Sequence, residues 1–366
     1  MTMMRFCCPS RDTSDLFSDQ CSNWFPCLSD PGEELCFVCV CVILVAARRS
    51  KLLPQLTSVM VHLVYIGFIF IFDTEFFEKL KTQPWYTLVY LLLFVATLVQ
   101  YFITCGTSPG YVLDAMRDYA TADASLRASE ISNEENLLQG SSNNGAVVVT
   151  LNRDQLGEIV SGDNGMNWTN LVMDMYPPRT SVMTVTCSCC KVVQPPRAKH
   201  CHDCNNCVLR FDHHCTWLGT CIGQGNHCQF WWYLFEETAL CIWTSMWYIE
   251  LLPDYIREPW LIVIIIIMLA ALSILTMFLL LLLIFHSYLI VTNQTTHEIL
   301  RRRRIPYMRP IPERVYPFSK GICKNLYRFC CGRMSIYSME ALPSVAEVNQ
   351  MSMPYSCFDV LSCRCC

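Results

Sequence analysis

The sequence predicts an α-helical polytopic membrane protein with four transmembrane helices and a cytosolic, two-zinc, cysteine-rich domain between helices 2 and 3. The 366-residue chain is 53% apolar and only 16% charged, whereas soluble domains are about one quarter charged. Its apolar residues gather in four runs, each near the roughly 20 residues that a bilayer requires. Cysteine and histidine are concentrated between the second and third runs, as zinc-binding domains require.

The four apolar runs differ in length and in how they begin. The second begins with Trp85 and Tyr86, a pair suited to the membrane interface. The fourth has 32 residues without formal charge and would extend about 48 Å as a helix, so one end should project into water or protein. In chain order the predicted spans are Leu56–Phe72, Trp85–Cys105, Phe230–Ile249 and Trp260–Val291.

Basic residues near the spans predict their orientation. Arg48, Arg49 and Lys51 precede the first span, and Arg301–Arg304 follow the last. We therefore expect both termini and the long middle segment to face the cytosol. Leu35–Ala47 is apolar but only 13 residues long, so we expect a re-entrant or interfacial segment. If it crossed the bilayer, the N-terminus alone would move to the lumen.

The remaining segments differ in composition. Thr121–Asn170 is rich in Ser, Asn, Asp and Gly and is predicted to be a flexible insert, with a short strand at Ala146–Leu151. The tail after Arg304 is punctuated by proline and predicted to be loosely structured. The expected divisions are a cytosolic N-terminal segment (1–55), helices 1 and 2 (56–105), a cytosolic linker (106–186), the cysteine-rich domain (187–228), helices 3 and 4 (229–292) and a cytosolic tail (293–366).

Charge and cysteine content exclude some classes of protein. A net charge of −4 argues against nucleic acid as the main partner. Met1–Asp30 lacks the features of a signal peptide, and the chain is too long for a small disulfide scaffold. We therefore expect the 25 cysteines to be reduced and to act as metal ligands, nucleophiles or acylation sites. Candidates for acylation in the tails are Cys7, Cys8, Cys330, Cys331, Cys363, Cys365 and Cys366.

Cys187–Cys221 contains eight cysteines and four histidines in 35 residues. Two closed zinc sites need eight ligands, so four of the 12 candidates are left over, and spacing alone does not decide which. Asp212, His213, His214 and Cys215 offer more than zinc binding requires, because a cysteine, a histidine and a carboxylate can form an activated nucleophile. The alternative is that all four serve metal binding or packing.

The stretch from Cys187 to Asn226 resembles the DHHC cysteine-rich domain of protein S-acyltransferases (palmitoyltransferases). Ser108–Gly110 resembles the Asp-Pro-Gly motif of that family, with serine in place of aspartate, and Thr295–Glu298 matches its Thr-Thr-x-Glu motif. The resemblance covers nearly the whole chain apart from Thr121–Asn170 and the extreme ends, and is strongest to plant members. Departures such as Thr216 remove no ligand or catalytic residue.

The resemblance implies specific roles. Cys215 would be the nucleophile, His213 its base and Asp212 the residue that orients the base. One structural zinc ion would be bound by Cys187, Cys190, His200 and Cys207. A second would be bound by Cys201, Cys204, His214 and Cys221.

The expected reaction is a ping-pong transfer of palmitate, or a similar long acyl chain, from acyl-CoA to cysteines of membrane-associated proteins. The expected partners are palmitoyl-CoA, such proteins and the lipid bilayer, without nucleic acid. Arg197, Lys199 and Arg210 are candidates for contacting coenzyme A phosphates, with a solvated face as the alternative. The resemblance suggests an endomembrane location, Golgi or vacuolar, with the plasma membrane as the alternative.

Three rival interpretations have weaker support. A RING-type ubiquitin ligase would need a cysteine where Gln224 stands. A catalytically idle scaffold would not need the intact Asp212–Cys215 tetrad. Metal transport would need ligands within the spans, where Cys241 and His286 alone give poor support.

Overall fold

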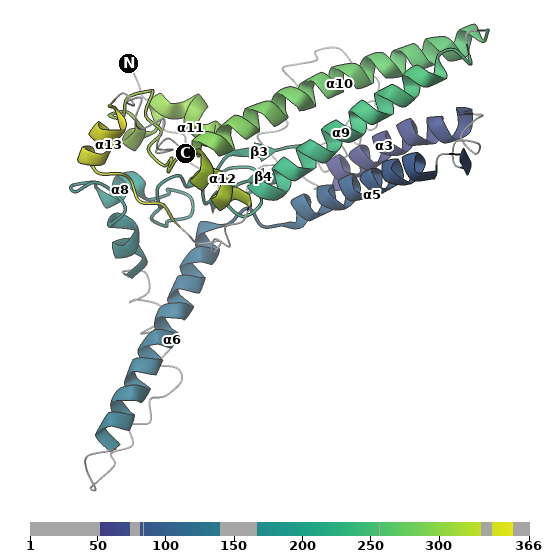
Figure 1. The fold of residues 1–366 in the computed structure, drawn as a ribbon. Coiled ribbons are helices and arrows are strands. Elements are labelled where there is room, and N and C mark those ends of the chain that lie inside the picture. Colours follow the sequence, from purple (N-terminus) through teal and green to yellow (C-terminus); the bar gives the residue numbers. More distant parts are fainter. Residues whose placement is uncertain are drawn as a thin grey trace, which may run out of the picture.

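The structure is a computed structural model that describes residues 52–73, 81–82, 84–139, 167–255, 257–330 and 339–353. A bundle of long helices carries a smaller domain of short strands and helices at one end (Figure 1). The predicted re-entrant segment Leu35–Ala47, the predicted strand Ala146–Leu151 and all the predicted acylation cysteines except Cys330 lie outside the described residues.

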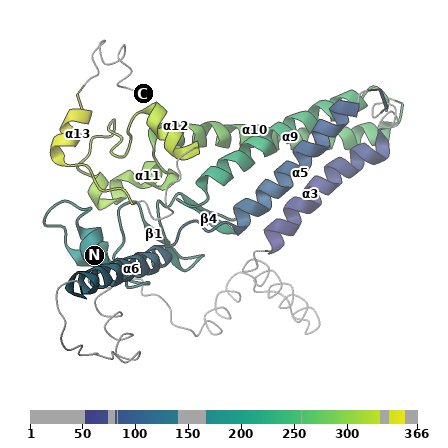
Figure 2. The same cartoon turned by 60° about the horizontal axis from the view of Figure 1, so that its bottom comes forward.

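Each predicted span coincides with one long helix, and the four helices run alongside one another (Figures 1 and 2). The first helix begins before its predicted span, since Pro54 lies in the first turn, where proline is tolerated. The four helices are α3 (Leu52–Phe72), α5 (Pro84–Gly106), α9 (His227–Leu251) and α10 (Pro259–Thr292).

In the described part of the chain, three helices are long and apolar enough to cross a membrane: α3, α5 and α10. Their side chains are apolar even where exposed, as at Ile71 and Ile274, which suits contact with lipid. Helix α9 has a comparable length of 25 residues but is less apolar than these three helices. It carries Glu236 and Glu237 near its middle. The predicted count of four spans is therefore supported for three.

Polar side chains inside the bundle connect its helices. His62 of α3 lies 3.1 Å from Glu237 of α9, and Tyr90 of α5 bonds Thr244 of α9 at 3.0 Å. Glu237 thus has a polar partner inside the bundle, whereas Glu236 Oε2 has no hydrogen-bond partner among the described residues. These contacts satisfy groups that would be costly against lipid.

The cysteine-rich segment forms two antiparallel hairpins. In the first, β1 (Lys199–Cys201) pairs with β2 (Asn206–Val208). In the second, β3 (His213–Cys215) pairs with β4 (Thr220–Ile222). Strands of three residues are too short to be stable alone, so the hairpins need cross-links or support from the helices.

Part of the predicted flexible insert is helical, which corrects the prediction. Helix α6 (Val112–Gln139) extends from the hairpin domain (Figure 1), and residues 167–173 are also helical. The Ser and Asn content suggested a loop, but Ala, Leu, Glu and Arg between those residues favour a helix. Val112 and Trp168 are buried in one apolar cluster, and this tertiary packing anchors α6.

The C-terminal tail is more ordered than predicted. Buried apolar side chains, including Ile305, Met308 and Phe318, form a cluster after α10. Proline and arginine concealed this pattern because the apolar residues lack helical periodicity. The short elements here are α11 (Thr296–Arg301), η1 (Arg302–Arg304), η2 (Pro306–Met308), α12 (Ile322–Cys330) and α13 (Val345–Met351), and α8 (Val182–Val185) precedes the hairpins.

Candidate active site

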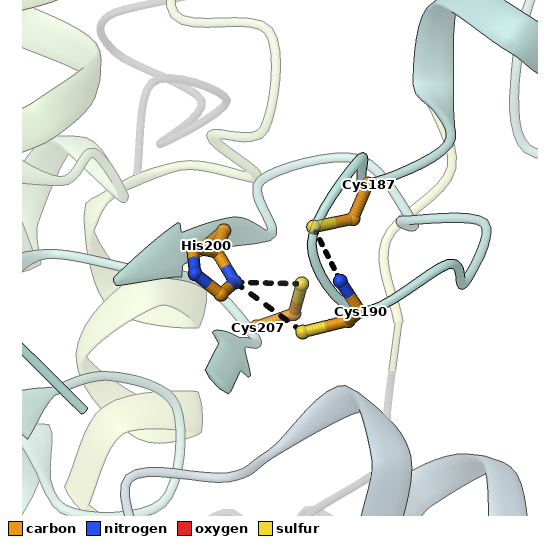
Figure 3. Close-up of side chains that lie close together, drawn as sticks. All are labelled: Cys187, Cys190, His200 and Cys207. Carbon is orange, nitrogen blue, oxygen red and sulfur yellow. Dashed lines mark hydrogen bonds between the residues drawn. The ribbon is translucent and has the colours of Figure 1, made fainter. Parts of the chain in front are cut away.

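Four possible metal ligands converge beside the first hairpin (Figure 3). His200 on β1 faces Cys207 on β2, and a turn after Thr186 brings Cys187 and Cys190 to the same point. His200 Nδ1 lies 3.3 Å from Cys190 Sγ and 3.8 Å from Cys207 Sγ. The backbone N–H of Cys190 donates to Cys187 Sγ at 3.3 Å.

A second group of four lies between the two hairpins. Cys201 and Cys204 come from the first hairpin, and His214 faces Cys221 across the second. His214 Nδ1 lies 3.7, 3.4 and 3.5 Å from the sulfurs of Cys201, Cys204 and Cys221. His200 and Cys201 are neighbours on β1 but join different groups, because successive strand residues point to opposite faces.

Both groups fit a zinc ion. A tetrahedral zinc with ligands at about 2.0–2.3 Å has ligand-to-ligand edges of about 3.3–3.8 Å, and the distances above lie in that range. Each group offers three sulfurs and one nitrogen, as structural zinc sites do. The residues predicted for each site are therefore brought together, and their role as ligands stays a prediction. Cys189 and His202 also lie near His200, but with His200 they supply only three ligands.

Successive side chains of β3 also point to opposite faces of the strand, which separates the possible zinc ligand His214 from His213 and Cys215. His214 points toward the second cysteine group, so its neighbours His213 and Cys215 share the opposite face. On that face the His213 ring lies against Phe230 of α9, with 5.5 Å between ring centroids, and His286 of α10, with 5.8 Å. The reactive face of β3 is thus turned toward the helix bundle.

Asp212 forms a hydrogen bond with His213 and accepts two further hydrogen bonds from Thr296. His213 Nδ1 lies 2.6 Å from Asp212 Oδ2. The backbone N–H and the hydroxyl of Thr296 donate to the two Asp212 oxygens at 2.7 and 2.8 Å. The Asp212 side chain is fully buried, whereas 30% of the His213 side chain is exposed. Thr296 therefore fixes the carboxylate that orients the histidine.

The turn between α10 and α11 delivers Thr296 to this position. Asn293 ends α10 in a left-handed conformation with φ 49°, a common helix stop. Thr295 then caps α11, accepting from the Glu298 backbone N–H while the Glu298 side chain accepts from the Thr295 N–H. The first threonine and the glutamate of the Thr-Thr-x-Glu motif thus form a capping box, and its second threonine, Thr296, binds Asp212.

These contacts favour the carboxylate form of Asp212 and make His213 a stronger base. Although burial opposes it, the hydrogen bond from His213 and the charges of nearby imidazoles lower the pKa of Asp212 well below its usual value. Burial likewise opposes charge on His213, but its hydrogen bonds to Asp212 and Cys215 and the negative charge of Asp212 raise the pKa of His213 to about 9. His213 thus bridges the carboxylate and the thiol.

Cys215 is buried where the second hairpin meets the helix bundle. It belongs to a continuous, mainly apolar cluster that runs from the hairpin into three of the long helices. The other buried members are Tyr101 of α5, Leu218 and Ile222 of the hairpin, Phe230, Leu234 and Cys241 of α9, and Leu272 and Leu279 of α10. The sulfur thus lies at the hairpin end of an apolar cluster that continues into the bundle.

Sequence reasoning missed two histidines beside Asp212. His227 and His286 are buried and place ring nitrogens within 4.8 Å of an Asp212 oxygen and of each other. His227 Nε2 lies 3.4 Å from His286 Nδ1. The available signal was His286 itself, because a histidine within an apolar run usually faces protein.

Ser108–Gly110 joins the end of α5 to the hairpin domain. Gly110 has φ 88°, and its carbonyl accepts from the Leu209 N–H at 2.8 Å. The Pro109 carbonyl accepts from the Gly225 N–H at 3.0 Å. A side chain on Gly225 would collide with the Ser108 carbonyl, which explains why glycine occupies that position.

The predicted phosphate contacts need correction. The Arg197 side chain is 2% exposed and paired with Glu298, so it is not free to bind phosphate. Arg210 donates to Asn293 at 2.7 Å, while its buried Nε has no hydrogen-bond partner among the described residues. Lys199 instead lines an open pocket of about 720 Å³. The residues that line it with Lys199 include His297, Arg301 and Arg304. Burial and the charges of Lys199 and Arg301 lower the pKa of His297 to about 4, as a positive field requires.

Comparisons with known proteins agree with this geometry. A family model described as DHHC palmitoyltransferase matches residues 182–303. The chain is 50% identical over 363 residues to "Protein S-acyltransferase 10" of Arabidopsis thaliana, covering 99% of this chain and 100% of that protein. The predicted resemblance to plant members is therefore confirmed.

More distant relatives match shorter stretches of the chain. "Palmitoyltransferase SWF1" of Saccharomyces cerevisiae is 46% identical over 69 residues, which are 18% of this chain and 20% of that protein. "Palmitoyltransferase ZDHHC17" of Danio rerio is 32% identical over 170 residues, 41% of this chain and 27% of that protein.

Proposed function

The chain belongs to the DHHC palmitoyltransferase family of protein S-acyltransferases, and from this premise we propose how it works. It transfers palmitate, or a similar long acyl chain, from acyl-CoA to cysteines of membrane-associated proteins through an acyl-enzyme at Cys215. The carrying observation is the position of His213, which contacts Asp212 through Nδ1 and shares a face of β3 with Cys215.

The proton path follows from this arrangement. Because Nδ1 of His213 bonds Asp212, Nε2 takes the proton from the Cys215 thiol. The thiolate attacks the thioester carbonyl of acyl-CoA and forms the acyl-enzyme. The coenzyme A thiolate leaves and takes the proton from His213 Nε2, so coenzyme A departs as a thiol and His213 is neutral again. In the second step a substrate thiol gives its proton to His213 and attacks the acyl-enzyme. The proton then returns to Cys215. One thioester replaces another, so no nucleotide is consumed.

The acyl chain would extend from Cys215 into the helix bundle. The apolar cluster that contains Cys215 also includes Tyr101, Leu272 and Leu279 from the long helices. Keeping the chain among apolar side chains and lipid preserves about 0.8 kcal/mol per buried CH₂. An enzyme within the membrane therefore need not extract its acyl donor into water.

The coenzyme A head group would lie at the pocket beside the first hairpin. Lys199, Arg301 and Arg304 line this pocket, and phosphates bind such basic clusters. This proposal replaces the expected roles of Arg197 and Arg210. Lys199→Gln together with Arg301→Gln should raise the KM for acyl-CoA about tenfold and leave kcat within threefold. An unchanged KM would show that the head group binds elsewhere.

Two zinc ions would be held by the two cysteine groups and would supply only structure. The second group contains His214, between His213 and Cys215. Fixing His214 therefore also fixes the two reactive side chains on the other face of β3.

We further propose that α9 is a fourth span. It packs against the three apolar helices, and Glu237 is paired with His62 and so faces protein. Both termini and the hairpin domain would then face the cytosol, as the arginines of η1 favour. Golgi or vacuolar membrane is the proposed location.

Labelling of purified protein tests the acyl-enzyme. We expect a clickable palmitoyl-CoA analogue to label the wild type, neutral hydroxylamine to remove the label, and Cys215→Ser to abolish it. The variant should keep two zinc ions per chain, measured by elemental analysis. Equal labelling of a zinc-loaded Cys215→Ser variant would exclude Cys215 as the nucleophile.

A further inference from the structure

The segment 339–353, which follows α12, is built into the hairpin domain. Met339 packs against the apolar cluster that contains Val112 and Trp168. The Leu342 N–H donates to the Met175 carbonyl at 3.0 Å. Leu342 and Val348 pack on the apolar cluster that follows α10. This segment lies outside residues 182–303, the region that the family model matches.

Glu340, in this segment, joins three parts of the molecule. One carboxylate oxygen accepts from Arg197 of the hairpin domain. The other accepts from Arg328 of α12 at 2.9 Å and from Asn293, at the end of α10, at 3.4 Å. Only 12% of the Glu340 side chain is exposed, so these charge-assisted bonds are shielded from water and therefore strong.

Arg197 connects Glu340 to the active site. Its Nε and Nη2 donate to the two Glu298 oxygens at 2.7 and 2.9 Å, a bidentate pair. Nη1 and Nη2 also donate to the side chain and backbone carbonyl of Asn293 at 3.2 and 3.0 Å. With the bond to Glu340, all five N–H groups of Arg197 have acceptors. Glu298 closes the capping box with Thr295, next to the Thr296 that binds Asp212.

The charges explain why a second carboxylate is needed. Arg197 is buried and Arg210 lies nearby; burial and the charge of Arg197 lower the pKa of Arg210 to about 10. With Glu298 as its only paired carboxylate, the buried Arg197 beside Arg210 would lack full charge compensation, which is costly. Without Glu340, Arg197 and the Glu298 that it holds would be expected to shift toward solvent or other partners.

We propose that Glu340 is a positioning residue, which fixes Asp212 and His213 through Arg197, Glu298 and Thr296. Through Glu340, the C-terminal segment then supports the geometry of the active site. This inference rests on the proposed function, because it assumes acyl-enzyme formation at Cys215.

The test measures acyl-enzyme formation by full-length wild type, Glu340→Gln and the matched control Glu347→Gln. Glu347 lies in the same segment but is exposed, in the cap of α13. We expect Glu340→Gln to lower kcat about tenfold with little change in KM, and Glu340→Asp to recover part of it. Glu347→Gln should stay within twofold of wild type.

A double-mutant cycle distinguishes positioning from general stabilisation. If Glu340 acts through Thr296, Glu340→Gln should cost much less in a Thr296→Val background than in wild type. Equal rates for Glu340→Gln and wild type, or effects of the two changes that simply multiply, would overturn the inference. If Glu340→Gln protein loses zinc, Arg328→Gln takes its place in the double-mutant cycle, because it removes only the outer partner of Glu340. Equal rates, or effects that simply multiply, would again overturn the inference. Failure of wild type itself to label would instead refute the proposed function.

Discussion

Within the described residues, two histidine–carboxylate pairs each have a cysteine nearby. In the first, His213 lies between Asp212 and Cys215. In the second, inside the helix bundle, His62 lies 3.1 Å from Glu237, and the nearby Cys241 contacts the carboxylate at 3.9 Å. Only in the first pair does the histidine lie between the two, so only it can take a proton from the thiol. The order of contacts, and not the set of residues, therefore separates a reactive site from a structural one.

The two pairs also differ in what holds them. The Asp212–His213 pair depends on three-residue strands cross-linked by the cysteine groups, whereas the His62–Glu237 pair joins two helices of more than 20 residues. The first should therefore be lost when the hairpins loosen, and the second should survive. The predictions that follow test this difference, in order of decreasing effect on acyl-enzyme formation.

Removal of zinc should have the largest effect. Structural zinc contributes much of the folding free energy of small metal domains, so chelation should abolish acyl-enzyme formation. The long helices do not contain the metal groups, and helix content measured by circular dichroism in detergent should fall only slightly. Full activity of protein shown to be free of zinc would refute the structural role of the two groups.

Asp212→Asn should lower acyl-enzyme formation by about a thousandfold. The neutral amide no longer stabilises the imidazolium and favours the wrong tautomer of His213, an effect of up to about 10⁴ in serine proteases. Single-turnover labelling measures this rate, and zinc content provides the folding control. A loss below tenfold would mean that Asp212 does not orient the base.

Thr296→Val should cost about tenfold in the same assay. It removes the hydroxyl bond to Asp212 but keeps the backbone N–H bond, and one hydrogen bond to a charged group contributes about 1.5–3 kcal/mol. Thr296→Ser restores the hydroxyl and should recover most of the rate. If serine and valine behaved alike, the hydroxyl would have no role.

Much of this site could be predicted from spacing and resemblance. The Cys187–Cys221 pattern indicated zinc-type groups, and the structure brings together the residues assigned to each. Asp212 and His213 are adjacent in sequence, so their contact required no knowledge of the fold. The apolar runs indicated the long helices because length and composition alone define them.

Other features depend on contacts between distant segments. Thr296 reaches Asp212 across 84 positions, and His286 lies beside the site only because α10 packs on α9. Arg197 looked available for phosphate, but its partner Glu340 is 143 positions away. Helix α6 was missed because local composition resembled a loop, whereas burial of Val112 beside Trp168 supplies the missing stability.

Glu237→Gln should have the smallest effect on acyl-enzyme formation, within about threefold, but a clear effect on stability. The change leaves His62 without its charged partner inside the bundle, and breaking a buried ion pair costs about 3–5 kcal/mol. Thermal unfolding in detergent should occur at a lower temperature than in wild type. Glu236→Gln is the matched control, because Glu236 is the adjacent residue of α9 and its Oε2 has no partner among the described residues, so its unfolding temperature should not fall. A loss of labelling as large as that of Asp212→Asn, in Glu237→Gln protein that remains folded, would show that the two pairs do not differ in the way their contacts indicate.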